Sequence, residues 1–158
     1  MMAISKQDRI IIPHLRRDSR ISLTSLSRHT GVPVSTAFEH LKKLRRDGVL
    51  SPISLLDFAH LGFHTRILVA LKVDMPLREK LEEYLSRSPH TNSLYRINNG
   101  YSLMLDAIFR NMRDSEDFME ELESEFMISR RAVFHVLGDL RREAFLSDPV
   151  MGVIALDK

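Results

Sequence analysis

Histidine side chains are the groups in this 158-residue sequence best suited to acid–base chemistry or metal binding. The sequence has no cysteine, which excludes disulfides, thiolate zinc sites and thiol nucleophiles. Asp57, His60 and His64 come closest to the spacing of metal ligands, but Gly62 would break any helix that aligned them. Phosphate-binding glycine loops and the Gly-x-Ser-x-Gly and His-Glu-x-x-His motifs are absent, so we expect no enzyme activity, cofactor or metal. The candidates for acid–base chemistry would be His60, His64, His90 and His135.

Basic residues are concentrated in the first part of the chain. Residues 1–60 contain 10 Lys and Arg against 5 Asp and Glu, whereas residues 61–158 contain 13 against 16. The net charge is therefore +5 in the first segment and −3 in the second. This asymmetry indicates that one part of the protein binds a polyanion.

The hydropathy pattern indicates a soluble cytoplasmic protein. The longest apolar stretches, residues 67–71 and 150–156, are far shorter than the ~20 residues of a membrane-spanning helix. The N-terminus becomes polar too early for a signal peptide.

Hydroxyl and basic side chains share one face of a predicted helix over residues 34–47. Ala37, Leu41 and Leu44, spaced by four and three residues, mark its buried face. In a DNA major groove the hydroxyls can reach phosphates or base edges, and the basic groups can neutralise phosphates. Phe38 is expected at the edge of the core beside Val34, with contact to a thymine methyl as the alternative. The predicted DNA-contacting residues are Ser22, Arg28, Ser35, Thr36, Glu39, His40, Lys42, Lys43 and Arg46.

Two further helices precede this one. The first is expected over residues 6–17, capped by Ser5 with Asp8 three residues later, and kinked or shortened by Pro13. The second is expected over residues 23–30 and ends at the turn Gly31-Val32-Pro33. A short β-hairpin, or wing, should follow over residues 49–55. This order is typical of a winged helix-turn-helix, although a three-helix bundle with solvated charges fits the spacing too.

The second part alternates between strand and helix patterns. Strands are expected over residues 64–74, 92–98, 101–111 and 131–137, with a turn at Asn99-Gly100. Helices should begin at Pro76 and at Asp114, the latter acting as a cap. The order βαββαβ predicts a ferredoxin-like domain with both helices on one face of an antiparallel sheet. The whole chain is therefore assigned to the α+β class.

The other face of the predicted sheet is too apolar to remain in water. It carries Leu68, Ala70, Met104 and Ile108 or, if the strands face the other way, the residues that alternate with them. A second copy related by two-fold symmetry would cover it, so we expect a homodimer. The alternative is a monomer in which residues 141–158 cap this face. In that segment, residues 141–146 could extend as a helix and residues 150–156 could add a strand.

These patterns divide the chain into four parts. We expect a winged helix-turn-helix over residues 1–50, a hinge or wing-strand linker over 51–63, a ferredoxin-like dimerisation domain over 64–140 and a C-terminal extension over 141–158.

The first half also contains a set of short motifs. They are Asp18-Ser19-Arg20-Ile21-Ser22-Leu23, the turn Gly31-Val32-Pro33-Val34-Ser35-Thr36, Leu41-Lys42-Lys43-Leu44, Asp47-Gly48-Val49, and the connector from Leu56-Asp57 to Leu61-Gly62. With these motifs the chain resembles the Lrp/AsnC (feast/famine) family of transcription regulators over roughly residues 5–140. The resemblance implies a winged helix-turn-helix joined by a hinge strand to an effector-sensing ferredoxin-like domain, in dimers that often form tetramers or octamers. It places Ser35, Thr36, Glu39, His40 and Lys43 near the major groove.

The effector side departs from this family. Its members tend to have Gly-x-x-Asp at the start of the third strand, beside a small-molecule pocket between dimers. Here Leu103 stands three residues after Gly100, and Asp106 lies on the opposite side of the strand. An amino-acid-like effector, if one binds, is expected to contact Asn98, Asn99, Gly100 and Ser102.

Two other functions remain open from the sequence. One is a protein-interaction module that keeps the winged fold without binding DNA. The other is an enzyme, because some relatives of the resembled family decarboxylate a siroheme-type tetrapyrrole.

Overall fold

The computed structural model describes residues 4–157 and divides into two compact units. The helical unit comprises residues 1–55 and 140–158, and the sheet unit comprises residues 56–139. By sequence the helical unit carries 13 Lys and Arg against 7 Asp and Glu, whereas the sheet unit carries 10 against 14. Among the described residues, no helix has the length and hydropathy needed to span a membrane.

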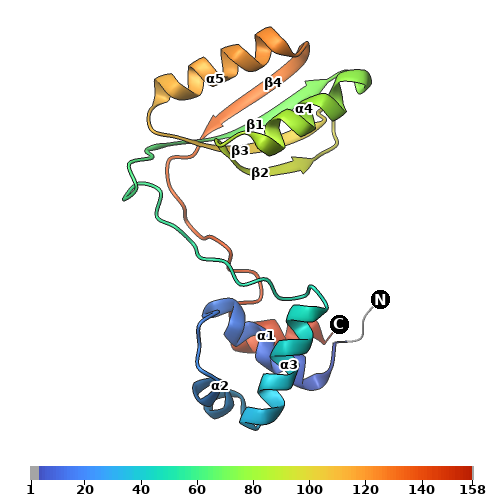
Figure 1. Ribbon diagram of the computed structural model, residues 1–158, viewed down its shortest axis with the longest axis vertical. Coiled ribbons are helices and arrows are strands. Elements are labelled where there is room, and N and C mark those ends of the chain that lie inside the picture. The colour runs from blue at the N-terminus through green and yellow to red at the C-terminus, as the bar shows by residue number, and fades with distance from the viewer. Residues whose placement is uncertain (1–3, 158) are drawn as a thin grey trace. The chain divides into compact units, whose positions relative to one another are not determined.

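Three helices form the first part of the helical unit, as predicted (Figure 1). Ser5 caps α1 through a reciprocal capping box with Asp8. Gly31 ends α2 in the left-handed conformation, with φ of 70°, which glycine adopts without steric cost. The core of the unit contains Ile11, Leu15, Leu26, Val32 and Ala37. The helices are α1 (Lys6–Arg17), α2 (Leu23–Thr30) and α3 (Val34–Arg46).

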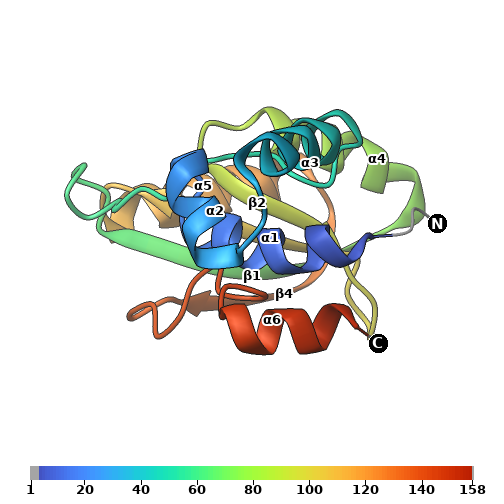
Figure 2. The same cartoon turned by 90° about the horizontal axis from the view of Figure 1, so that it is seen from below.

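The C-terminal segment completes this unit. Residues 149–156 form helix α6 (Pro149–Leu156), which packs along α1 (Figures 1 and 2). The strand considered for residues 150–156 is therefore wrong, and residues 141–146 form no helix. A run of apolar residues without a clear period is compatible with either element, and packing decides between them. Helix α6 belongs to the helical unit.

Pro13 does not shorten α1, which runs for 12 residues through it. The ring is buried against α6, where a Cβ added to Gly152 would lie 2.7 Å from Pro13 Cγ. Pro13 therefore serves as a packing surface for α6.

The hairpin expected over residues 49–55 is absent, since these residues form neither strand nor helix. Leu50 packs against the helical core, and the backbone N–H groups of Val49 and Leu50 both bond to the carbonyl of Leu44. These bonds direct the chain back onto the end of α3 instead of into a strand pair.

The sheet unit has the predicted βαββαβ order. Its four strands pair antiparallel in the order β2-β3-β1-β4, with α4 and α5 covering one face (Figure 1). The elements are β1 (Thr65–Val73), α4 (Met75–Arg87), β2 (Thr91–Arg96), β3 (Leu103–Phe109), α5 (Met112–Glu125) and β4 (Ile128–His135). The fold class is thus confirmed as α+β with a ferredoxin-like sheet.

Two details of the sheet unit differ from expectation. Asn111, not Asp114, caps α5: its side chain accepts a hydrogen bond from the backbone N–H of Asp114 at 3.0 Å. The last strand begins at Ile128, three residues before the predicted start. Alternating residues of β1 and β3 form the core beneath the helices, namely Ile67, Val69, Leu71, Val73, Leu103, Leu105, Ala107 and Phe109.

Candidate functional site

The outward side of α3 is the strongest candidate for nucleic-acid binding. Ala37 and Leu44 point into the core, which leaves Ser35, Glu39 and Lys42 exposed on the opposite side. Pro33 precedes α3 without a side-chain cap, and the first intrahelical bond is donated by the N–H of Ala37. The earlier N–H groups of the first turn are therefore available to an anion such as a phosphate.

Positive charge extends along the same helix. Lys42 and Lys43 form no salt bridge among the described residues, and Lys42 is the more exposed of the two. Arg46 Nε lies 3.1 Å from Asp47 Oδ1, but 74% of the Arg46 side chain is exposed. Arg28, in the last turn of α2, is also exposed. These groups are accessible to a polyanion at the exposed side of α3 and the end of α2.

The sequence favoured a position for Phe38 at the edge of the core, but the side chain lies outside the core. It is 47% exposed and belongs with Ser35 and Lys42 on the outward side of α3. The small side chain of Ala37 fills the core position one residue earlier, so the helix turns Phe38 outward. Contact with a thymine methyl is the alternative that this geometry favours.

His40 is not a free DNA-facing group. Its Nδ1 lies 2.6 Å from Oδ1 of Asp8, a carboxylate of α1 that is only 2% exposed. Burial would raise the pKa of Asp8, but hydrogen bonds from His40 and Ser5 outweigh it and hold the pKa below its ordinary value. The sequence could not reveal this partner, because Asp8 and His40 are 32 residues apart.

The remaining predicted DNA contacts are Ser22 and Thr36. Ser22 is exposed and caps α2, where its hydroxyl accepts a hydrogen bond from the N–H of Ser25 at 3.1 Å. Thr36 lies half-buried in the first turn of α3. Both are close to the helix N-termini of the helix-turn-helix, where backbone N–H groups also point outward.

The residues expected to bind an effector lie in the turn between β2 and β3. Asn98, Asn99 and Gly100 are exposed, and Asn99 has a φ of 61°. The hydroxyl of Ser102 donates to the carbonyl of Val73 at 3.3 Å, so it links the start of β3 to the end of β1. None of these four residues lines the cleft between α4 and α5.

Leu103 and Asp106 occupy opposite faces of β3, as predicted. Leu103 is buried beneath the helices, whereas Asp106 lies on the helix-free face. There Arg66 binds the carboxylate with two hydrogen bonds, Nε to Oδ1 at 2.8 Å and Nη2 to Oδ2 at 2.9 Å. Asn92 donates a third at 2.6 Å. Asp106 is therefore fully engaged and cannot replace the acidic residue missing at position 103.

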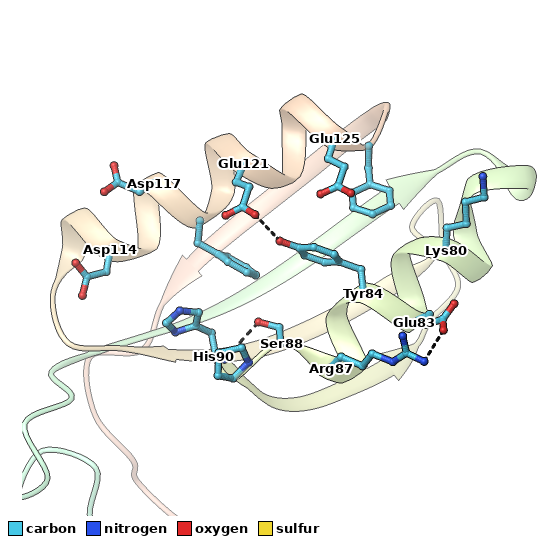
Figure 3. Close-up of a pocket in the computed structure, with 13 residues that line it drawn as sticks. Lys80, Glu83, Tyr84, Arg87, Ser88, His90, Asp114, Asp117, Glu121 and Glu125 are labelled. Carbon is cyan, nitrogen blue, oxygen red and sulfur yellow. Dashed lines mark hydrogen bonds and ion pairs between the residues drawn. The ribbon is translucent and has the colours of Figure 1, made fainter.

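A cleft of about 980 Å³ lies between α4 and α5 (Figure 3). The Tyr84 hydroxyl donates to Glu121 at 2.8 Å across it, and this bond, with burial and the negative charges of α5, raises the pKa of Tyr84 to about 12. His90 forms part of the wall, with its ring stacked on Phe109 at 4.6 Å and Nδ1 placed 3.2 Å from the carbonyl of Ile108. Its partners are those of a structural histidine.

The other histidines do not assemble a reactive site. His60 pairs with Asp57 at 2.7 Å in an exposed i,i+3 contact, without His64. His64 and His135 are both exposed. Within residues 4–157 there is no group of three His, Asp or Glu side chains that could hold a metal ion.

Comparison with known proteins places these features in context. Residues 4–51 match a model of winged helix-turn-helix DNA-binding domains. Over 149 residues the chain is 26% identical to an uncharacterized HTH-type transcriptional regulator of Pyrococcus furiosus, which covers 94% of this chain and 100% of the relative.

Solved structures show the same fold. A transcriptional regulator of Neisseria meningitidis, solved as a complex with L-Met, superimposes with a TM-score of 0.81 at 17% identity, covering 89% of this chain and 94% of that one. AsnC of E. coli superimposes with a TM-score of 0.77 at 15% identity, covering 89% and 97%.

Proposed function

We propose that this chain, which has the fold of the Lrp/AsnC proteins, is a helix-turn-helix transcriptional regulator that reads duplex DNA with α3 as a homodimer. The observation that carries the proposal is the exposed side of α3, where hydroxyl, aromatic and basic groups lie together and outside the core. A regulator of this kind acts on the chromosome, so we expect it in the cytoplasm, and the proposal assigns it no catalytic step.

In this proposal α3 lies in the major groove. Ser35, Phe38 and Glu39 approach base edges, where a hydroxyl, a thymine-methyl contact and a carboxylate acceptor for cytosine each favour particular bases. The basic groups around them contact phosphates and supply the sequence-independent part of the affinity. The predicted phosphate contacts are Arg28, Lys42, Lys43 and Arg46.

The helix-free face of the sheet supports the dimer. Leu68, Ala70, Met104 and Ile108 alternate with the core residues of β1 and β3, so they lie on this face. Ala70 and Ile108 are already buried within the chain, at 4% and 9% exposure, and Leu68 and Met104 are half-buried, so the surface left for a partner is smaller than the sequence predicted. Tyr95 and Phe134, opposite Met104 and Leu68 in the strand register, are each 57% exposed. A second copy would cover these side chains by two-fold symmetry. The operator would then be roughly palindromic, with half-sites about one helical turn or a multiple apart.

An amino-acid-like effector is the remaining part of the proposal. One structure of similar fold contains L-Met. The turn of Asn98, Asn99, Gly100 and Ser102 offers amide and backbone groups for the polar ends of such a ligand, and its exposure leaves room for a neighbouring dimer to complete a pocket.

The test is DNA binding by the full-length protein across a range of salt concentrations, on a duplex selected from a random pool and on an unrelated duplex. Affinity should fall steeply with salt. Lys42→Ala should weaken binding to both duplexes alike and reduce the slope of log affinity against log salt by about one. The mass of the complex should correspond to two chains on a palindromic duplex.

Lys80→Ala is the matched control, because Lys80 is an exposed lysine of α4 in the sheet unit. It should leave affinity and salt slope unchanged. Binding that ignored salt, or a Lys42→Ala variant with unchanged affinity, would contradict the proposal.

A further inference from the structure

A buried carboxylate connects the start of α1 to the middle of α3. Asp8 accepts hydrogen bonds at Oδ2 from the backbone N–H of Ser5 at 2.9 Å and from the Ser5 hydroxyl at 2.7 Å. Its other oxygen, Oδ1, lies 2.6 Å from Nδ1 of His40. Both oxygens of a carboxylate that is 2% exposed are therefore occupied, and one of them is committed to α3.

His40 lies on the side of α3 that packs against the rest of the helical unit, so a rotation of α3 about its axis would displace its side chain from Asp8. It lies three residues after Ala37 and four before Leu44, so it is on the inward side of the helix with these two core residues. Ala37 and Leu44 make apolar contacts, which are not directional. A hydrogen bond to a buried carboxylate is directional, and it therefore specifies the rotation of α3 about its axis more sharply than the core does.

Rotation of α3 matters for base recognition. Side-chain ends lie about 5–6 Å from a helix axis, so a rotation of about 20° moves them by roughly 2 Å. Binding groups must be held to within about 0.5 Å of their productive geometry. Contacts with phosphates are more tolerant, because they depend mainly on charge.

We propose that Asp8 and His40 are positioning residues for sequence recognition, whose hydrogen bond sets the rotation of α3 relative to α1 and so the register of its exposed side against the bases. The inference depends on the proposed role of α3 in reading DNA. It replaces the sequence-based expectation that His40 itself contacts DNA.

The test is the ratio of affinities for a selected duplex and an unrelated one, measured for wild type, Asp8→Leu, His40→Leu and the double variant. Each single variant should reduce this ratio by about tenfold, the equivalent of one lost base contact, with little change in affinity for the unrelated duplex or in its salt slope. The double variant should lose no more than either single variant, because both remove the same bond.

Two further variants separate positioning from folding. Ser5→Ala removes a hydrogen bond to the same carboxylate without touching His40, so it should lower the melting temperature but keep the ratio. His40→Asn retains an amide donor at the position of Nδ1, within reach of Asp8, and should recover most of the ratio.

The possible outcomes are distinguishable. An Asp8→Leu variant that folds and keeps the wild-type ratio would overturn the positioning role, as would losses that add in the double variant, since these indicate direct DNA contact by His40. Equal loss in Ser5→Ala would assign the effect to helix stability and overturn it too. A wild-type protein that did not distinguish the two duplexes would overturn the proposed function and this inference together.

Discussion

The two units of this chain organise charge and burial in opposite ways. The helical unit has a net charge of +6 and exposes its lysines and arginines along α3, while the sheet unit has a net charge of −4. Each unit buries one carboxylate, Asp8 in the first and Asp106 in the second, but with different partners. Asp8 pairs with the imidazole of His40, whereas Asp106 pairs with the guanidinium of Arg66.

The units also differ in how the chain builds them. The sheet unit is one continuous segment with a large core under two helices. The helical unit has a smaller core and is closed by α6, from the other end of the chain. Arg9 pairs with Asp157 and Arg16 with Glu143, so α1 and the C-terminal segment are joined by ion pairs as well as by packing. We therefore expect substitutions to affect one unit at a time, and each prediction below tests that separation.

The largest effect is expected from Asp106→Leu in the sheet unit. This change leaves the Arg66 guanidinium, whose side chain is 22% exposed, and the Asn92 amide without their main acceptor. Removing one member of a buried ion pair costs about 3 kcal/mol. Denaturant unfolding followed by residue-resolved hydrogen exchange should show the loss in β1 and β3 but not in α1–α3.

The double variant Arg66→Met with Asp106→Leu is its control. Replacing both charges by apolar side chains removes the guanidinium that the single variant leaves with Asp139 as its remaining ion-pair partner, so stability should return to within about 1 kcal/mol of wild type. If the single variant were no less stable than the double one, the ion pair would not be what stabilises this face.

A smaller effect is expected from Gly152→Ala in the helical unit. The added Cβ would meet Pro13 Cγ at 2.7 Å and the carbonyl oxygen of Leu146 at 3.0 Å, so α6 must move away from α1. Overpacking of this kind costs about 1–3 kcal/mol. Hydrogen exchange should increase in α1 and α6 and stay unchanged in the sheet.

Gly138→Ala is the matched control, because a Cβ there meets nothing within 4 Å. It should leave both units as stable as wild type. A Gly152→Ala protein with wild-type exchange in α1 would show that α6 does not stabilise the helical unit.

Regular elements and their local signals were predictable from the sequence. Ser5 with Asp8 and Gly31 mark helix ends through contacts within three or four residues, and strict alternation identifies β1. The exposed positions of α3 followed from the spacing of Ala37 and Leu44. These features depend on neighbours along the chain, which is the information that periodicity carries.

Features that depend on distant partners were not predictable. The direction of the His40 side chain is set by Asp8 of α1, 32 residues away. Strand alternation predicted the face on which Asp106 lies, but not its partner Arg66, 40 residues away. Helix α6 is apolar on nearly every side, so its residues show no period that distinguishes a helix from a strand. Each of these is decided by tertiary packing, which overrides local preference.

The smallest expected effect is a loss of stability at alkaline pH that is confined to the sheet unit and is caused by ionisation of Tyr84. Its pKa of about 12 lies above the ordinary value of 10.0, so folding favours the neutral phenol. The resulting stability is complete below pH 10 and is lost as the pH rises from 10 to about 12. Near-ultraviolet absorbance should show tyrosinate forming at about pH 12 in wild type, and Tyr84→Phe should remove that transition.

Glu121→Gln should shift the Tyr84 transition toward pH 10, because the acceptor loses its charge. Glu79→Gln, an exposed change elsewhere on α4, should not shift it. If Tyr84→Phe kept the transition at pH 12, the transition would not come from Tyr84 and its hydrogen bond to Glu121. If alkaline unfolding began in α1–α3, the loss of stability at high pH would not belong to the sheet unit.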